Sequence, residues 1–174
     1  MRTIVSTLLL FTALLVTSCS SVRVVHDYDK EVDFSKYSSF AFYKPAIDEV
    51  KISDLDKRRI LRAIENELTQ KGMTKSSSPG VIVSIYTKEQ ERVDIYQHYN
   101  YGWWGPYYDP FGPRSHISRT TEGTLFIDIL DAKSKVLIWQ GIGYADISAK
   151  DSERKEKKIQ EIVAKILDSY PPTP

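Results

Sequence analysis

The sequence predicts an α+β fold in which an antiparallel sheet of about five strands is covered on one face by two helices. Segments rich in β-branched and aromatic residues outnumber the helical patterns. Their order along the chain is β-β-α-β-β-β-α, without the regular alternation of strand and helix that favours a parallel sheet. Apolar residues in both helical patterns fall on one face, so each helix has one side to bury.

The first half of the chain is predicted to contain two strands and one helix. Val22–Tyr28 and Tyr37–Tyr43 are β-branched or aromatic segments between polar turns. Ser53, with Asp56 three residues later, is typical of a helix start, because each side chain can bond the other residue's backbone N–H. Gly72 is typical of the helix end. The apolar residues that keep helical spacing between them are Ile60, Leu61, Ile64 and Leu68.

The second half is predicted to contain three strands and a closing helix. The segment "VIVSIYTKEQERV" follows a Pro-Gly turn and reads as a strand that becomes polar from Thr87 onward. Gly123–Asp131 and Val136–Ile147 form a predicted hairpin joined by "AKSK", with Phe126 and Trp139 expected in the core under the helices. A helix is predicted over residues 152–168, with the charged run "ERKEKK" on its solvated face.

The two strands on either side of the central aromatic segment suggest a projecting arm. Pairing Ile82 opposite Asp128 also places Arg92 opposite Ser118, so apolar residues meet apolar residues and polar meet polar. A strand pair of this kind lies half in the core and half beyond it. We therefore expect an aromatic-tipped hairpin that extends from the domain.

The segment at the tip, "YNYGWWGPYYDPFGP", is unusually aromatic. Tyr96 to Phe111 contain 8 of the 20 Phe, Trp and Tyr residues, with glycines and prolines between them. Three interpretations of this aromatic loop (residues 96–116) remain open: a lid on the sheet, a protein contact, or a surface for a glycan or lipid. The candidate contact residues are Tyr99, Tyr101, Trp103, Trp104, Tyr107, Tyr108 and Phe111.

The first residues have the features of a lipoprotein signal peptide. An early Arg2 precedes an apolar run too short to span a bilayer, and the run ends in Val16-Thr17-Ser18-Cys19. These four residues resemble a bacterial lipobox, which implies cleavage after residue 18 and acylation of Cys19. Residues 1–18 are then the signal peptide, and 19–174 a single domain held on the membrane by its N-terminal lipid, with palmitate among the acyl groups. A simple secretory signal is the alternative.

Charge and cysteine content exclude several classes of protein. Removing Arg2 with the signal peptide leaves 24 − 1 = 23 basic residues against 23 acidic ones, so the sequence has no electrostatic footprint for nucleic acid. Cys19 is the only cysteine, which excludes an intramolecular disulfide and a cysteine-based metal cluster. Because Ser20 follows Cys19, resemblance to enteric lipoproteins favours the outer membrane, facing the periplasm, as the location.

Three segments resemble the bacterial lipoprotein family defined by domain of unknown function 4136. They are "VDFSKYSSFAFY", "RILRAIENELTQKG" and "EGTLFIDILDAKSKVLIWQGIG", and the resemblance extends from about Val22 to Leu167. It implies an uncharacterised cell-envelope lipoprotein of α+β fold, often with an aromatic and glycine-rich insert. The family supplies no assigned activity and no catalytic residues.

A direct search for reactive groups yields only weak candidates. His98 and His116 flank the aromatic loop with Asp109 between them, which is too little to predict a metal site or, with a serine, a hydrolase triad. Asp128 and Asp131 could form a carboxylate pair, but their strand-end and turn positions favour hydrogen-bonding roles.

We therefore predict a non-catalytic interaction module without cofactor or metal. Gly141-Ile142-Gly143 lies inside a strand pattern and indicates a bulge or close backbone approach rather than phosphate binding. The expected partners are the membrane, through the lipid anchor, and an envelope protein or glycan. The alternative is an enzyme or binding protein acting on an envelope glycan or lipid, whose carboxylates the fold would have to bring together.

Overall fold

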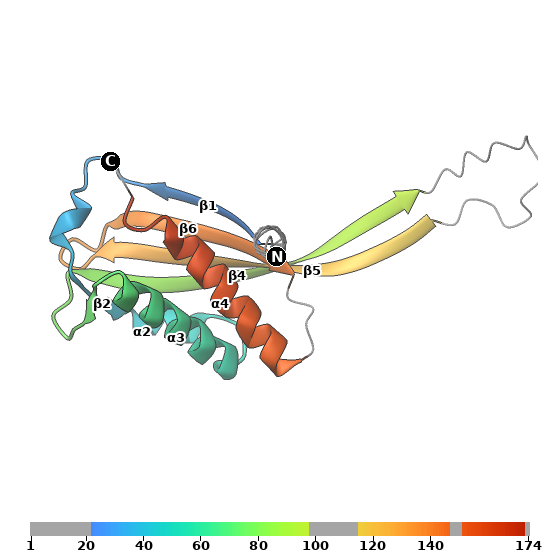
Figure 1. The fold of residues 1–174 in the computed structure, drawn as a ribbon, viewed down its shortest axis with the longest axis horizontal. Helices are drawn as coiled ribbons and strands as arrows, with labels where there is room; N and C mark the ends of the chain where they lie inside the picture. Colours follow the sequence, from blue (N-terminus) through green and yellow to red (C-terminus); the bar gives the residue numbers. More distant parts are fainter. Residues whose placement is uncertain (1–21, 98–114, 147–150, 173–174) are drawn as a thin grey trace, which may run out of the picture.

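The computed structural model describes residues 22–97, 115–146 and 151–172, which form a mixed α+β domain (Figure 1). Six strands make one sheet in the order β1-β6-β5-β4-β2-β3. In chain order the elements are β1 (Arg23–Tyr28), the 3-10 turn η2 (Phe34–Lys36), β2 (Ser39–Phe42), α2 (Lys44–Glu49), α3 (Asp54–Gln70), β3 (Thr74–Lys75), β4 (Val81–Gln97), β5 (Ser115–Asp131), β6 (Leu137–Asp146) and α4 (Ser152–Asp168).

The predicted α+β class is confirmed, but the sheet is not wholly antiparallel. β2 runs parallel to both β4 and the two-residue strand β3, while all other neighbours are antiparallel. The chain passes from β2 through α2 and α3 before it returns as β4, and such a helical crossover is what brings two strands together in parallel. The short β3 and α2 carry too few residues to leave a periodic signal, so the sequence predicted five strands instead of six and two helices instead of three.

Both long helices begin and end where the sequence predicts. Ser53 caps α3 by accepting a hydrogen bond from the backbone N–H of Asp56 at 3.2 Å, and its hydroxyl donates to the Asp56 carboxylate at 2.8 Å. The helix ends before Gly72, which has a φ of +85° that a side chain would disfavour. At α4, Asp151 accepts from the backbone N–H groups of Glu153 and Arg154.

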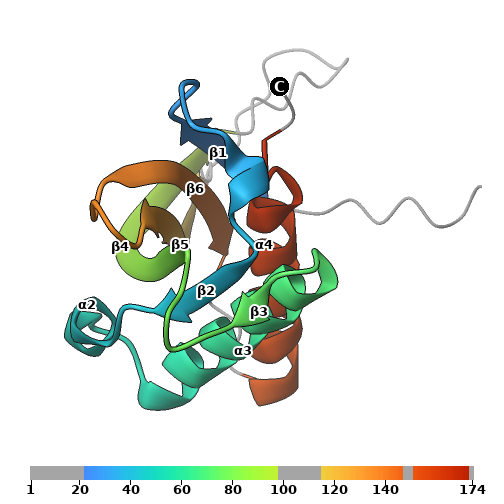
Figure 2. The same ribbon diagram turned by 90° about the vertical axis from the view of Figure 1, so that its left-hand side faces the viewer.

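The core lies between the sheet and the pair α3 and α4, which cover the same face (Figure 2). Gly141 and Gly143 on β6 let α4 approach closely, as predicted. A Cβ at Gly143 would lie 2.7 Å from Ile162 Cγ1, and one at Gly141 would collide with Ile166 and Trp139. These isoleucines therefore fill the space that the two glycines leave.

Trp139 is fully buried under the helices, as predicted, but Phe126 is not. Phe126 pairs with Ile142 across the β5–β6 ladder, on the sheet face away from α3 and α4. There it packs at 5.5 Å between ring centroids against Tyr86, which is 57% exposed. The alternation of side chains along β5 explains the difference, because Leu125 and Ile127 already occupy the helix-facing positions.

The predicted arm is present in the backbone of β4 and β5, in a different register. Ile82 lies opposite Leu130 rather than Asp128, a shift of two residues. Because side chains alternate with a period of two, a shift of two residues leaves the same residues of β4 and β5 sharing a face, so polarity alone did not distinguish the two registers.

The arm extends well beyond the rest of the sheet (Figure 1). The β5–β6 pairing ends at Glu122, whereas β4 and β5 remain paired as far as Gln97 and Ser115. At ~3.4 Å per residue, the stretch from Glu91 to Gln97 spans roughly 20 Å. Two strands alone therefore carry the chain away from the core.

Candidate functional site

A cleft of about 590 Å³ lies at the root of the arm, between the sheet and the N-terminal halves of α3 and α4. We call it the arm-root cleft. Its size is typical of small-molecule sites. The lining residues come from the α3 start, the middle of β4 and β5, the end of β6 and the first turns of α4: Lys51, Ile52, Ser53, Asp56, Ile60, Thr87, Lys88, Glu89, Gly123, Thr124, Leu125, Ala145, Lys155, Lys158, Ile159 and Ile162.

Two small residues form the floor of the arm-root cleft. Gly123 on β5 pairs with Ala145 on β6, and both lie on the helix-facing side of the sheet, in line with Leu125 and Gly143. At Gly143 the side chains of α4 reach the sheet and fill the space. Two residues further along β6, Ala145 lies in the lining of the cleft and is only 3% exposed.

Asp56 forms a polar wall of the cleft and ties the two helices together. Its carboxylate accepts hydrogen bonds from Lys155 Nζ at 2.6 Å and from Arg59 Nη1 at 2.8 Å. Arg59 also donates to the Ser152 hydroxyl at 2.6 Å. The side chain of Asp56 is only 10% exposed, so this cross-helix pairing is largely shielded from water.

The pKa of Asp56 reflects this environment. Burial by itself raises the pKa of the carboxyl, but the hydrogen bonds from Lys155, Ser53 and Arg59 outweigh that effect and lower it below its ordinary value. Asp56 is therefore ionised at neutral pH, and its hydrogen-bonding capacity is used within the protein. This makes it a structural carboxylate rather than a general acid or base.

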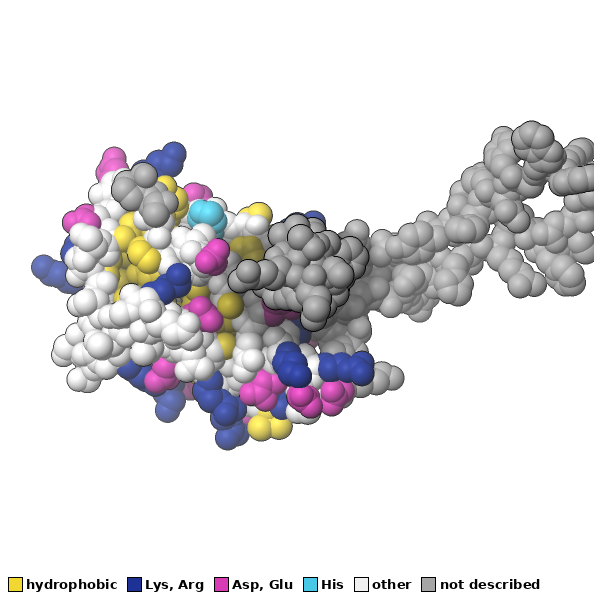
Figure 3. Space-filling view, viewed as in Figure 1, with side chains coloured by type: hydrophobic (Ala, Val, Ile, Leu, Met, Phe, Trp, Pro, Cys, Tyr) yellow, Lys and Arg dark blue, Asp and Glu magenta, His cyan; other side chains and the backbone are white. Residues whose placement is uncertain are grey.

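Charged residues of both signs line the cleft. Lys51, Lys155 and Lys158 lie on its helix side with the carboxylates of Asp56 and Glu89, whereas the side chain of Lys88, which pairs with Thr124, is on the opposite face of the sheet. Figure 3 shows basic and acidic side chains interleaved along the margin where the N-terminal ends of α3 and α4 lie. Lys158 binds Glu161 at 3.2 Å, and Asp56 has Arg59 as a second cationic partner from outside the lining. The two lysines that α4 contributes to the lining are therefore both paired with acidic side chains.

The residues singled out as functional candidates by the sequence lie outside the described part of the chain. This holds for the lipidation residue Cys19 and for all seven aromatic contact residues between Tyr99 and Phe111. The structure places only the two ends of their segment, Gln97 and Ser115, which face each other at the end of the arm. His98 and Asp109 also lie outside the described residues.

Asp128 and Asp131 have separate hydrogen-bonding roles, as predicted. Asp128 accepts from Gln140 Nε2 at 2.7 Å, and burial raises its pKa. Asp131 accepts from the backbone N–H and the hydroxyl of Ser134 in the β5–β6 turn and from the Tyr37 hydroxyl at 2.8 Å, and these bonds hold its pKa well below the ordinary value. Neither carboxylate is positioned as the partner of the other.

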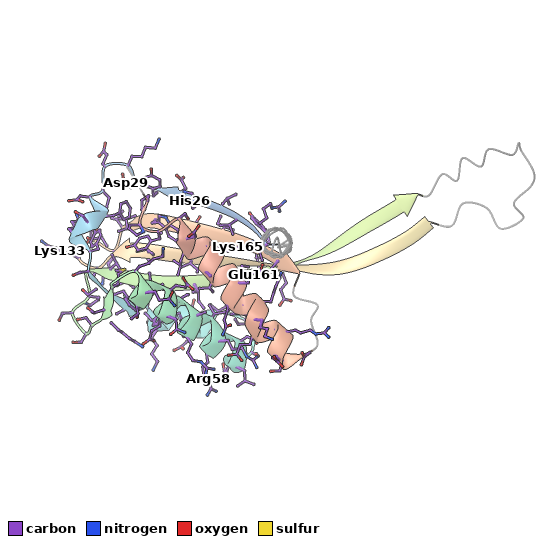
Figure 4. All side chains as sticks on the ribbon, in the orientation of Figure 1. His26, Asp29, Arg58, Lys133, Glu161 and Lys165 are labelled. Atoms are coloured by element: carbon purple, nitrogen blue, oxygen red, sulfur yellow. The ribbon has the colours of Figure 1, made fainter. Side chains whose placement is uncertain are left out.

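Several other ionisable side chains of the described residues lie on separate parts of the surface. Figure 4 shows His26 on β1, Arg58 on α3 and Lys133 in the β5–β6 turn, each pointing outward from a different part of the domain. Within residues 22–97, 115–146 and 151–172, no three His, Cys, Asp or Glu side chains are arranged to hold a metal ion. No helix in the described ranges is long and apolar enough to cross a membrane.

The arm-root cleft was not predicted from the sequence. The run "ERKEKK" was interpreted as a solvated helix face, and Arg154 and Lys157 are indeed largely exposed. Lys155, in the same run, instead reaches Asp56 on the neighbouring helix. The small pair Gly123 and Ala145 was the available signal, but its meaning depends on the strand register and on the course of α4.

The sequence matches the family described as a domain of unknown function (DUF4136) over residues 24–172. The chain belongs to this family. The match covers every described strand and helix apart from the first residue of β1, so the DUF4136 domain contains both the arm and the arm-root cleft. No protein of curated function matches the chain.

One solved structure shares the general fold at low sequence identity, and a second aligns more weakly. A PDZ domain protein from Parabacteroides distasonis aligns with a TM-score of 0.54 and 17% identity, covering 97% of this chain and 41% of that one. The DUF4136 chain thus spans less than half of that protein. A PelC dodecamer from Paraburkholderia phytofirmans aligns with a TM-score of 0.47 and 11% identity, over 84% of this chain and 94% of the PelC chain.

Proposed function

We propose that this DUF4136 protein is a lipid-anchored, non-catalytic protein of the cell envelope that contacts a partner through the aromatic segment of its arm. The observation that carries the proposal is the two-stranded extension of β4 and β5 beyond Glu122. A two-stranded ribbon on its own is marginally stable in water, so a projecting arm adds little to the stability of the domain. Such an arm can instead serve to present the segment that joins β4 to β5 to a partner.

The composition of the presented segment supports a contact surface. Tyrosine and tryptophan rings supply large contact areas at low entropic cost, and glycine, proline and asparagine allow the chain to adapt around them. The proposed contact residues are those between Tyr99 and Phe111 named above. Because such rings bind proteins and also stack on sugars, the partner is an envelope protein or an envelope glycan.

The lipid anchor is proposed at Cys19, with the domain at the outer membrane facing the periplasm. Three residues lie between Cys19 and Arg23, where β1 begins. Arg23 pairs with Tyr144, close to the end of β6 and to the arm root. An anchor at this position would hold the arm-root end of the domain near the membrane surface. More than one acyl chain would make that attachment stable.

Replacing the aromatic segment tests the contact function directly. In cells, the wild-type protein and a variant with Tyr99–Pro113 replaced by a short Gly/Ser turn are crosslinked and purified side by side. We expect a partner that is captured by the wild type and lost from the variant. A control carrying Lys133→Gln, in an exposed turn at the opposite end of the domain, should retain it.

The same experiment separates the remaining alternatives. If the capture profiles match and the loop variant melts at a lower temperature, the aromatic rings are a lid on the sheet. Capture of peptidoglycan or lipopolysaccharide would identify a glycan or lipid partner. The anchor is tested by Cys19→Ser, which should move the protein from the membrane fraction to the soluble periplasmic fraction. Retention in the membrane would contradict lipidation at Cys19.

A further inference from the structure

We propose that the sheet face opposite α3 and α4 pairs with the same face of a second copy of this chain, forming a two-fold symmetric dimer. We call this surface the open face. The proposal does not depend on the partner contact of the aromatic segment. It rests on a row of apolar side chains that crosses four strands and on charges whose placement complements a second copy.

The apolar row runs across the open face from β1 to β4. Its four residues lie opposite one another in the strand register: Val25, Ile142, Phe126 and Tyr86. The two middle residues are half-buried, whereas Val25 is 47% and Tyr86 is 57% exposed. Apolar side chains that gather on one surface, unlike scattered ones, indicate a contact surface.

Charged residues border the apolar row on both sides. Two residues along the strands toward the arm, the neighbouring row carries the exposed Lys88 of β4. Two residues in the other direction, the row carries the half-buried Asp128 of β5. On β1, Arg23 and Asp27 occupy the corresponding positions in these two rows. One side of the apolar row is therefore basic and the other side is acidic.

The environment of Asp128 favours a cation from a second copy. Within the chain its carboxylate accepts a hydrogen bond from Gln140 Nε2, an uncharged donor, at 2.7 Å. Burial raises the pKa of Asp128, so its negative charge is disfavoured in the single chain. A lysine placed beside this carboxylate would favour the charged form.

A two-fold axis along the apolar row brings the basic and acidic rows together. The axis places the apolar row on itself, with the two sheets face to face and their strands running in opposite directions. Packed sheets lie ~10 Å apart. Lys88 of one copy then lies above β4 of the second copy, one strand away from Asp128 on β5 and within reach of a lysine side chain. The symmetry repeats every such contact, as in other isologous interfaces.

Charge also argues against the neighbouring register. There the apolar row would cover Ile82 and Leu130, the next apolar pair on the open face. The two-fold axis would then run along the row of Asp128 and bring the Asp128 carboxylates of the two copies opposite each other. Because burial already disfavours one such charge, two facing charges are less favourable still. The charges therefore select the register in which the apolar row lies on itself.

The selected axis places the β1 strands of both copies at the same edge of the dimer. β1 is an edge strand of the sheet, and the axis maps every strand onto the same strand of the second copy. With the proposed lipid at Cys19, both copies could therefore be anchored to one membrane. This compatibility rests on the proposed anchor, whereas the pairing of the open faces does not.

Crosslinking through single cysteines tests the symmetry. The protein is the full chain carrying Cys19→Ser, so an introduced cysteine is its only thiol whether or not the anchor exists. Ile142→Cys lies on the proposed axis, and a short bismaleimide should join two copies. Leu130→Cys, four residues from Phe126 along β5, would lie roughly 27 Å from its mate and should not be joined. Equal crosslinking of the two variants, or none at Ile142, would overturn the pairing.

Analytical ultracentrifugation of the same protein tests the apolar row. Tyr86→Glu brings two carboxylates together at the axis and should weaken dimerisation at least tenfold. Leu55→Glu is the matched control, because Leu55 is a similarly exposed apolar residue, 59% exposed, on α3. It should leave dimerisation unchanged. Equal effects of the two substitutions, or a monomer at every concentration of the parent protein, would overturn the dimer.

The charge pairing is tested by a double-mutant cycle. Lys88→Gln and Asp128→Asn should each weaken dimerisation about threefold to tenfold, and the double variant should lose no more than the weaker single variant. Lys133→Gln should have no effect. In dilute, monomeric protein Asp128→Asn should instead be stabilising, because it removes a charge that burial disfavours. Additive losses in the cycle, or a dimer that ignores both substitutions, would overturn the pairing of Lys88 with Asp128.

Discussion

The two ends of the surface beneath α4 are built differently, although both rest on small residues of the sheet. Above Gly141 and Gly143, the isoleucines of α4 descend until no room remains for a Cβ. Above Gly123 and Ala145, the helix leaves a hollow of about 590 Å³. The first end is held by packing, and the second by the ion pairs and hydrogen bonds of Asp56 and Arg59.

This difference shows how a single helix can serve both stability and access. Close packing gains dispersion and removes apolar area from water, but it excludes any ligand. A charged bridge between the helix ends contributes less per contact, yet it fixes the spacing of α3 and α4 while leaving the sheet below uncovered. The predictions below test this comparison, from the largest effect to the smallest.

Filling the packed end should be far more harmful than filling the hollow end. We expect Gly143→Val to lower the free energy of unfolding by about 3 kcal/mol, because its Cβ already lies 2.7 Å from Ile162 Cγ1 before the branched methyls are added. The matched change Gly123→Val adds the same atoms to the hollow end and should alter stability by less than about 1 kcal/mol. Urea denaturation of both variants measures the difference. Equal losses would show that the arm-root cleft is not open in solution.

Removing the carboxylate charge of Asp56 should weaken the hollow end. Asp56→Asn leaves Lys155 and Arg59 without their shared anion, and we expect a loss of about 2 kcal/mol in the free energy of unfolding. Asp54→Asn is the control, since Asp54 lies two residues before Asp56 in the first turn of α3 and its side chain is 82% exposed. A loss no larger than that of the control would contradict the role of Asp56 as the tie between α3 and α4.

The contribution of Asp56 should also depend on pH in a defined direction. Its pKa is lowered in the folded state, so the unfolded chain takes up a proton more readily as the pH falls. The stabilisation is therefore fully present above the ordinary aspartate pKa of about 3.9 and is lost as the pH falls through the folded-state pKa. Stability curves of wild type and Asp56→Asn should converge at acid pH. A constant difference down to low pH would exclude this linkage.

Loss of the α3 cap should have an intermediate effect. Ser53→Ala removes both the bond to the backbone N–H of Asp56 and the hydroxyl that donates to its carboxylate. A loss of about 1 kcal/mol is expected from the N-cap alone. Ser53→Asp keeps a capping acceptor but places a second carboxylate beside Asp56, so it should restore less stability than Ser53→Thr. Thermal unfolding distinguishes the three variants.

The smallest effect is expected on the sheet face opposite α3 and α4. Burial raises the pKa of Asp128, so its ionised form is disfavoured in the folded protein. Asp128→Asn keeps an acceptor for Gln140 and removes the charge, which should raise the melting temperature at pH 7 by about 1–3 °C. The gain should vanish as the pH falls toward the ordinary aspartate pKa, where the wild-type carboxyl becomes protonated. A lower melting temperature at pH 7 would contradict this view.

Local sequence signals located most of the elements and several details of the fold. Ser53 and Gly72 marked the two ends of α3, because a capping hydroxyl and a residue free to adopt positive φ have meaning within a few residues. The pattern of Gly141 and Gly143 indicated a close backbone approach for the same local reason. Phe126 was predicted on the wrong face, because its segment has apolar residues on both sides. Which side faces the helices is decided by tertiary packing, and in the structure Leu125 and Ile127 face them.

By itself, the sequence determined the α+β class, the bounds of both long helices and the paired strands of the arm. These follow from periodicity and from short-range hydrogen bonding. Only the tertiary structure decided the parallel placement of β2, the two-residue register shift of β4 on β5, and the arm-root cleft. The cleft depends on where α4 stops touching the sheet and on Lys155 reaching Asp56, 99 residues away in the chain. Contacts between such distant residues leave no periodic signal in the sequence.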